Sequence, residues 1–294
     1  MINFLTYLIN GISLGSIYAI IALGYTMVYG IAKMLNFAHG DVIMIGGYLI
    51  YTFATTYGMH PLLSILIAIV GCTILGITTE KIAYKPLRNA SSNLAVLITA
   101  IGVSYFLQNI ALLIFGANTK SFSSVVSWKI QLLGGEVIIQ GITIVTILTS
   151  LVILLLLELF IKFTKSGQAM LAVSEDKGAA TLMGINVNRT ISLTFAIGSG
   201  LAAIAGALLC SAYPTLTPYT GAMPGIKAFV AAVLGGIGSI PGAMIGGLLL
   251  GVVEILSKRY ISTQLADAIV FGILIIILLV KPTGLLGKNI QEKV

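Results

Sequence analysis

Long runs of apolar residues, separated by shorter polar segments, make up most of this chain. Each run is about 20 residues long, the length that an α-helix needs to cross the hydrocarbon core of a bilayer. The runs lack the ten-residue alternation of a membrane β-barrel, and helices satisfy their backbone hydrogen bonds within lipid. The pattern predicts an all-α, polytopic transmembrane helical bundle of about eight spans, in one domain over residues 1–294. Six predicted spans are 4–31, 40–57, 61–83, 94–116, 137–161 and 191–213.

The apolar region 226–256 is interrupted by GGIGSIPG at residues 235–242, and a last span is expected over 264–280. The break favours a re-entrant pair of half-helices, with two short spans or one long kinked helix as alternatives. Non-helical backbone at membrane depth is tolerated where it is buried in protein or faces a water-filled cavity. Gly235, Gly236 and Gly238 are therefore candidates for the translocation pathway.

The distribution of Lys and Arg predicts the orientation, because basic loops are retained in the cytoplasm. An extracytoplasmic N-terminus and a cytoplasmic C-terminus place eleven of the sixteen basic residues inside. The net charge of +7 is explained by this topology and by attraction to anionic membrane lipid, so nucleic acid is not an expected partner. Inside are Lys33, Lys81, Lys85, Arg88, Lys162, Lys165, Lys177, Arg189, Lys281, Lys288 and Lys293; outside are Lys120, Lys129, Lys227, Lys258 and Arg259.

Composition excludes a soluble protein, since 58% of the residues are hydrophobic and 9% charged, against about 25% charged in soluble domains. Glycine is abundant, at 33 of 294 residues. Small residues four positions apart predict faces where helix backbones pack closely. Cys72, Cys210, His39 and His60 lack the spacing of a disulfide or zinc site, so no metal or catalytic residue is expected. The small-residue series are Gly11/Gly15, Gly198/Ala202/Gly206, Gly242/Gly246 and Gly247/Gly251.

The longest polar interruption covers residues 162–190 and is expected in the cytoplasm as a coupling loop. Within it, Ser174 is a candidate N-cap for one short helix whose first turn holds Glu175 and Asp176 and which ends at Gly184. A capped, exposed helix between two membrane spans suggests a surface on which a partner protein docks.

NFAHGD, at residues 36–41, is the densest polar cluster of the early spans. One interpretation is structural: Asn36 ends one helix, Asp41 caps the next, and Gly40 allows the turn. The other places Asn36, His39, Gly40 and Asp41 at the cytoplasmic mouth of a translocation pathway. The sequence alone leaves both interpretations open.

Few ionisable residues fall within the apolar runs, where a proton-coupled carrier would need them. Glu158 precedes Lys162 by four residues and Glu254 precedes Lys258 by four, so both are expected as ion pairs near helix ends. Asp267 is expected near the outer surface. Because no GxxxxGK[ST] motif is present, the chain is not expected to bind ATP by itself.

Three blocks together identify a family resemblance over nearly the whole chain: GISLGSIYAIIALGYTMVYGI with NFAHGD, then SEDKGAATLMGINVNR, then KAFVAAVLGGIGSIPGAMIGGLLLG. They resemble the permease subunits of bacterial branched-chain amino-acid ABC importers. The resemblance implies an inner-membrane importer that moves Leu, Ile and Val by alternating access. The implied partners are a second permease, two cytoplasmic ATPase subunits that hold ATP and Mg, and an extracytoplasmic substrate-binding protein.

The resemblance also assigns residues 162–190 as the segment that docks on an ATPase, with coupling expected at Glu175, Asp176, Ala179, Leu182 and Gly184. The chain itself is then not an enzyme and binds no cofactor. Urea, short amides and other neutral amino acids remain alternative substrates, because related permeases look similar. A passive channel or a secondary carrier is a further alternative, although neither needs the docking segment.

Overall fold

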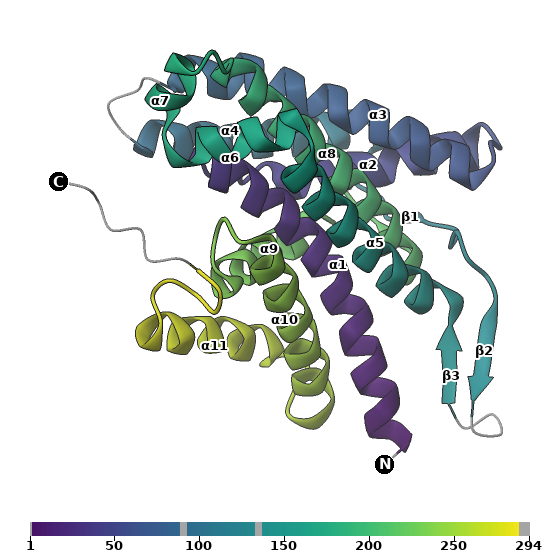
Figure 1. Cartoon of the computed structure of the whole chain (residues 1–294). Coiled ribbons are helices and arrows are strands. Elements are labelled where there is room, and N and C mark those ends of the chain that lie inside the picture. Colours follow the sequence, from purple (N-terminus) through teal and green to yellow (C-terminus); the bar gives the residue numbers. More distant parts are fainter. Residues whose placement is uncertain (1, 89–92, 133–136, 288–294) are drawn as a thin grey trace.

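The computed structural model describes residues 2–88, 93–132 and 137–287, and forms a bundle of helices around a long first helix (Figure 1). Lys288 and Lys293, which the sequence predicts on the cytoplasmic side, lie outside the described residues. The helices are α1 (Ile2–Ala32), α2 (His39–Tyr51), α3 (Pro61–Thr79), α4 (Asn93–Phe115), α5 (Gly141–Phe163), α6 (Lys165–Glu175), α7 (Lys177–Leu182), α8 (Val187–Ala212), α9 (Ala222–Gly235), α10 (Ile240–Tyr260) and α11 (Ala266–Val280).

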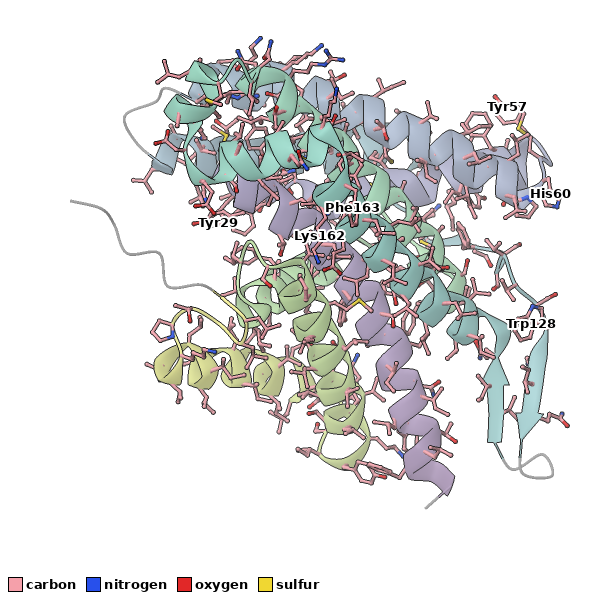
Figure 2. The ribbon with its side chains drawn as sticks, in the orientation of Figure 1. Tyr29, Tyr57, His60, Trp128, Lys162 and Phe163 are labelled. Carbon is pink, nitrogen blue, oxygen red and sulfur yellow. The ribbon has the colours of Figure 1, made fainter. Side chains whose placement is uncertain are left out.

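Shorter elements complete the chain. A π-helical turn, η1 (Thr52–Thr56), extends α2, and η2 (Glu80–Tyr84) with the 3₁₀ turn η3 (Lys85–Leu87) extends α3. Tyr57 and His60 lie in the turn that joins α2 to α3 (Figure 2), where the His60 ring accepts a hydrogen bond from the Leu62 amide. Strands β1 (Lys120–Ser121) and β4 (Thr215–Leu216) pair antiparallel, as do β2 (Lys129–Leu132) and β3 (Val137–Gln140).

Six helices of the described residues are long and apolar enough to cross a membrane. This confirms the predicted polytopic helical bundle. Their side chains divide in the way that a lipid-embedded protein requires: α8 is largely buried, while α3, α4 and α5 expose apolar side chains on their outer faces. The six are Phe4–Ala32, Pro61–Leu87, Leu94–Phe115, Gly141–Phe163, Val187–Ala212 and Ile240–Tyr260.

The centre of the bundle is α1, which packs against α5, α8, α9 and α10. Its contact with α10 depends on small residues. A Cβ added to Gly15 would lie 2.7 Å from the Leu248 Cα, and one added to Gly247 would lie 2.5 Å from the Ala19 Cα. Because backbone faces backbone at these points, the predicted close packing of small-residue faces is confirmed.

The helix break at GGIGSIPG is also confirmed. It separates two helices of unequal length, α9 and α10. Gly236 (φ 103°) and Gly238 (φ 95°) adopt backbone conformations that side chains with a Cβ rarely take, and the Ser239 hydroxyl caps α10. At 1.5 Å per residue the 14-residue α9 spans about 21 Å, too short for a ~30 Å hydrocarbon core. The 21-residue α10 is long enough to cross.

Two predicted helix starts are wrong by four residues: α8 begins at Val187 and not at 191, and α5 begins later than predicted. The span expected from residue 137 begins at Gly141, because Val137–Gln140 forms a strand paired with Lys129–Leu132. The β-branched run VII fits a hairpin as well as a helix, and short apolar runs do not distinguish the two. The Gly141 amide donates to the Trp128 carbonyl at 2.8 Å, so the hairpin passes directly into α5 (Figure 2).

Candidate functional sites

The polar segment 162–190 folds into two helices, α6 and α7, and not into the single helix that was predicted. Asp176 separates them and caps α7, its Oδ1 accepting from the amides of Gly178 (2.6 Å) and Ala179 (2.9 Å). The prediction that Ser174 is the cap is therefore wrong. Its hydroxyl donates to the Leu171 carbonyl within α6, since the Thr164 hydroxyl already starts that helix ten residues earlier.

The α7 helix and the residue after it present a mixed surface. Leu182 and Met183 are 90% and 82% exposed, and Glu175 and Ala179 are exposed as well. Gly184 ends the helix with φ 80°, as predicted from its position. Large apolar side chains exposed on a short capped helix, in a segment too polar to lie in lipid, are typical of a protein-docking surface.

The same segment is anchored to the bundle. Met170 and Val173 of α6 and Ala180 of α7 are buried. The Lys177 Nζ donates to the Ala32 carbonyl at the end of α1, at 3.0 Å. Desolvation there lowers the pKa of the Lys177 ammonium, and the charges of Arg88 and Lys33 lower it further. The start of α7 is thus in direct contact with the end of the central helix.

The structure corrects the cap roles predicted for NFAHGD. The first helix ends at Ala32, followed by Lys33 at φ 58°, so Asn36 does not end it. Instead the buried Asn36 Oδ1 accepts from the Tyr84 hydroxyl at 2.8 Å. Asp41 lies inside the first turn of α2 and accepts from the Gln108 Nε2 at 2.8 Å, so it is not the N-cap. Tertiary partners compete successfully with the local capping bonds.

Gly40 and His39 mark a close approach of helices and not a turn. A Cβ added to Gly40 would lie 2.6 Å from the Gly221 carbonyl oxygen, where the starts of α2 and α9 meet. The His39 ring packs edge-on against Tyr25, 4.7 Å between centroids, and its Nε2 has no hydrogen-bond partner among the described residues. All four predicted pathway residues of NFAHGD are buried, and their role in the pathway stays a prediction.

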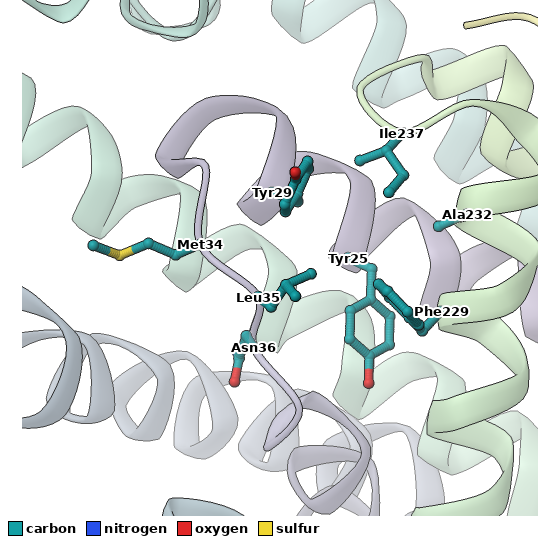
Figure 3. Close-up of a pocket in the computed structure, with 8 residues that line it drawn as sticks. All are labelled: Tyr25, Tyr29, Met34, Leu35, Asn36, Phe229, Ala232 and Ile237. Carbon is teal, nitrogen blue, oxygen red and sulfur yellow. The ribbon is translucent and has the colours of Figure 1, made fainter. Parts of the chain in front are cut away.

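A very small cavity lies between α1, the segment that follows it, and α9 (Figure 3). Its volume is about 10 Å³, roughly what one water molecule occupies. Asn36 lines it together with Ile237 of the GGIGSIPG loop, whereas His39, Gly40 and Asp41 do not. The lining residues are Tyr25, Tyr29, Met34, Leu35, Asn36, Phe229, Ala232 and Ile237.

Gly235 and Gly236 of the GGIGSIPG loop are covered by other backbone, whereas Gly238 is exposed. The Gly235 carbonyl accepts from the Leu286 amide at 2.9 Å, and a Cβ on Gly236 would lie 2.7 Å from the Gly287 Cα. Gly238 lies beside Gly30 of α1, whose added Cβ would be 3.2 Å from the Gly238 Cα. The structure therefore brings this loop to the end of α1 near Asn36.

A second cavity, of about 410 Å³, opens between α1, α8, α9 and α10. It contains a charged cluster that was not predicted, because Lys227 was expected only as an outer basic residue at the start of the apolar region 226–256. The structure places Lys227 within α9, with its side chain 7% exposed. The cavity is lined by Leu14, Tyr18, Leu209, Tyr213, Thr215, Thr217, Thr220, Met223, Pro224, Lys227, Glu254 and Lys258.

Glu254 is the centre of this cluster. Its Oε1 accepts from Lys227 (2.8 Å) and Lys258 (2.6 Å), and its Oε2 from the Tyr18 hydroxyl (2.9 Å). Lys227 also pairs with Asp267 at 2.7 Å. The predicted Glu254–Lys258 pair is thus present but belongs to a larger network. The only sequence signal for it is a lysine inside the apolar run AMPGIKAFVAAVLG.

Elsewhere in the described residues the charges form simpler pairs. Lys162 bonds Glu158 at 2.6 Å, as predicted from the spacing. Glu80 is buried with Arg88 and accepts from the Ser192 hydroxyl at 2.5 Å. Within residues 2–88, 93–132 and 137–287, no three His, Cys, Asp or Glu side chains are grouped to hold a metal ion.

A helical membrane bundle with a broken helix, a polar cavity and a short exposed helix anchored to its end is typical of a multi-pass membrane transport protein. Comparison with known proteins specifies which one. Residues 7–279 match the family described as "Branched-chain amino acid transport system / permease component", and the chain belongs to this family.

Three relatives illustrate the match. The chain is 46% identical to the high-affinity branched-chain amino acid transport system permease protein LivH of Escherichia coli (strain K12), over 99% of this chain and 98% of that one. It is 43% identical to BraD of Pseudomonas aeruginosa, with the same coverage. It is 32% identical to a probable branched-chain amino acid transport permease of Methanocaldococcus jannaschii, over 92% of this chain and 88% of that one.

Proposed function

We propose that this chain is the permease subunit of an ATP-driven importer that carries Leu, Ile and Val across a bacterial inner membrane. The observation that carries the proposal is the end-to-end similarity to permeases named for branched-chain amino acid transport. Its partners are a second permease, two ATPase subunits and an extracytoplasmic substrate-binding protein. ATP and Mg are bound by the ATPase subunits, so the chemical energy enters through a neighbouring protein.

The ATPase docks on α7, in this proposal, through Glu175, Asp176, Ala179, Leu182 and Gly184. The exposed Leu182 and Met183 side chains supply apolar area for the contact. Asp176 holds the start of α7 in place through its two capping bonds. The bond from Lys177 to the end of α1 carries movement of α7 into the bundle.

The docking segment lies on the cytoplasmic side, which puts the N-terminus outside and the C-terminus inside. The 26-residue α8 follows α7 and spans about 39 Å, so its end, beside Leu209 and Tyr213, lies on the opposite side of the membrane. The 410 Å³ cavity then faces outward, and the one-water cavity beside Asn36 lies on the inner half. ATP binding closes the ATPases and rocks the helices, so that access alternates between the two faces.

The test is uptake by the complete importer in proteoliposomes. Leucine uptake that requires ATP and the binding protein supports the proposal. Uptake of urea or a short amide in place of leucine would assign the alternative substrates. Accumulation by liposomes that hold this chain alone would identify a secondary carrier and overturn the proposal.

Coupling is tested by Glu175→Ala and Gly184→Val. Both variants should insert normally, continue to hydrolyse ATP and take up less leucine for each ATP hydrolysed. In Gly184→Val the valine is strained at φ 80°, which distorts the docking surface. Ser174→Ala is the matched control, because the Ser174 hydroxyl bonds only within its own helix. Wild-type coupling in both test variants would contradict docking at α7.

A further inference from the structure

The cavity between α1, α8, α9 and α10 combines features that a site for an amino acid requires. Its volume of about 410 Å³ falls in the range of ligand pockets, roughly 300–1,000 Å³. One part of its wall is charged, at Lys227, Glu254 and Lys258. Another part is apolar, at Leu14 and Leu209, so a ligand with one charged and one apolar end fits the lining.

Burying the charged part of the cavity wall costs desolvation free energy. The side chains of Glu254 and Lys227 are 1% and 7% exposed, and desolvation of such a pair can outweigh its attraction. Ionisable groups within membrane helices are accordingly often functional. The other buried pair, Glu80 with Arg88, shows what a structural pair looks like here: neither residue lines the 410 Å³ cavity.

Lys258 can donate hydrogen bonds to a ligand in the cavity. Its ammonium has three donors, its side chain is 36% exposed, and the described residues supply one acceptor, Glu254. Lys227 is already shared between Glu254 and Asp267, whereas Lys258 pairs with Glu254. A carboxylate in the cavity can therefore accept a hydrogen bond from the Lys258 ammonium.

We propose that this cavity is the site at which the importer receives a zwitterionic α-amino acid with an apolar side chain, its carboxylate bound by Lys258. The apolar side chain lies against Leu14, Leu209 and Met223. Glu254 faces the ammonium group and keeps Lys227 in position. This inference rests on the proposed function, and deepens it by naming residues that contact the substrate.

Alkylation protection in the detergent-solubilised importer tests the site directly. A thiol at Met223→Cys lies in the cavity wall, and Met59→Cys, at a similarly exposed methionine in the turn between α2 and α3, is the matched control. The native Cys72 and Cys210 are buried and contribute little background. Leucine should slow alkylation of Met223→Cys and leave Met59→Cys unchanged.

Two further comparisons identify the carboxylate contact. Leucinamide, which lacks the carboxylate, should protect at a concentration roughly tenfold or more higher than leucine. Lys258→Gln in the Met223→Cys background should raise the leucine concentration for half-protection by a similar factor, and Lys258→Arg should restore most of it. Lys227 still pairs with Glu254 in these variants, so the fold is retained.

Three results would overturn the inference: no leucine protection of Met223→Cys, equal protection by leucinamide, or an unchanged half-protection concentration in Lys258→Gln. The last outcome would assign Lys258 a structural role only. These failures are distinct from failure of the proposed function. If the wild-type importer takes up leucine while protection is absent, the site is wrong and the function stands.

Discussion

The proposed coupling segment, residues 162–190, and the charged cavity both depend on acidic residues, but the surroundings of these residues are opposite. In the coupling segment, Glu175 and Asp176 are consecutive, exposed and engaged with their own backbone or with solvent. In the cavity, Glu254 is buried and accepts from groups on α1, α9 and α10. A motif of neighbouring charged residues can be predicted from the sequence, whereas a charge network formed by distant helices cannot.

The two regions are joined by one helix. Lys177 bonds the end of α1 at Ala32, and the cavity includes Tyr18 of the same helix. Fourteen residues separate these positions, about 21 Å along the helix axis. A rigid α1 therefore offers a direct physical connection between the proposed docking surface and the cavity.

The largest effect should come from Glu254→Gln. The change removes the carboxylate that Lys227 and Lys258 share, and Lys227 keeps only Asp267 as a partner. Breaking a buried pair costs about 3–5 kcal/mol, and the remaining Asp267 contact places the expected loss at the lower end of this range. The apparent melting temperature of the solubilised protein should fall accordingly. Glu158→Gln, at a solvent-accessible pair, is the control and should cost about 0–1 kcal/mol. Equal effects of the two changes would contradict the contrast between the regions.

A double change sharpens the same point. Lys227→Met with Glu254→Leu replaces the two most buried members of the network by apolar groups, and replacing a buried pair in this way is often neutral for stability. The remaining members, Lys258 and Asp267, are partly exposed to solvent. We expect the double variant to regain most of the stability lost in Glu254→Gln and to remain defective in leucine uptake. Full recovery of uptake would show that the charges of the cavity serve only the fold. The measurement pairs thermal unfolding with proteoliposome transport.

An intermediate effect is expected for Asp176→Ala. Loss of an N-cap typically costs about 1 kcal/mol, and here it frees the amides of Gly178 and Ala179. Hydrogen exchange of these two amides should accelerate while exchange in α8 stays unchanged. Asp176→Ser, which retains a capping oxygen, should restore protection. Exchange that rises throughout the bundle would mean that α7 is not an independently opening unit.

The smallest effect on stability should come from Leu182→Ser. Leu182 is 90% exposed, and surface substitutions of this kind change stability within about ±0.5 kcal/mol. Co-purification of the ATPase subunits should nevertheless decrease, because apolar docking area is lost. Leu113→Ser, at an 86% exposed leucine of α4, is the matched control and should leave ATPase binding intact. Unchanged ATPase binding in Leu182→Ser would remove this residue from the docking surface.

Most of the fold could be predicted from the sequence because each membrane helix is encoded by local information. A run of about 20 apolar residues forms a helix wherever lipid surrounds it, so a helix lies at each predicted span and most of the ends were close. The glycines Gly236 and Gly238 likewise marked the helix break through their own backbone requirement. The boundary at Gly141 was missed because β-branched residues fit both a strand and a helix.

The same distinction between local and long-range information applies to the candidate sites. By itself, the sequence determined the membrane class, the helix break and the polar segment 162–190, since length, composition and spacing are properties of neighbouring residues. Only the tertiary structure decided that Asn36 binds Tyr84, that Asp41 binds Gln108 and that Lys227 meets Glu254. In a low-dielectric bundle, a buried polar group takes the partner that packing brings within reach, and that partner comes from a distant helix.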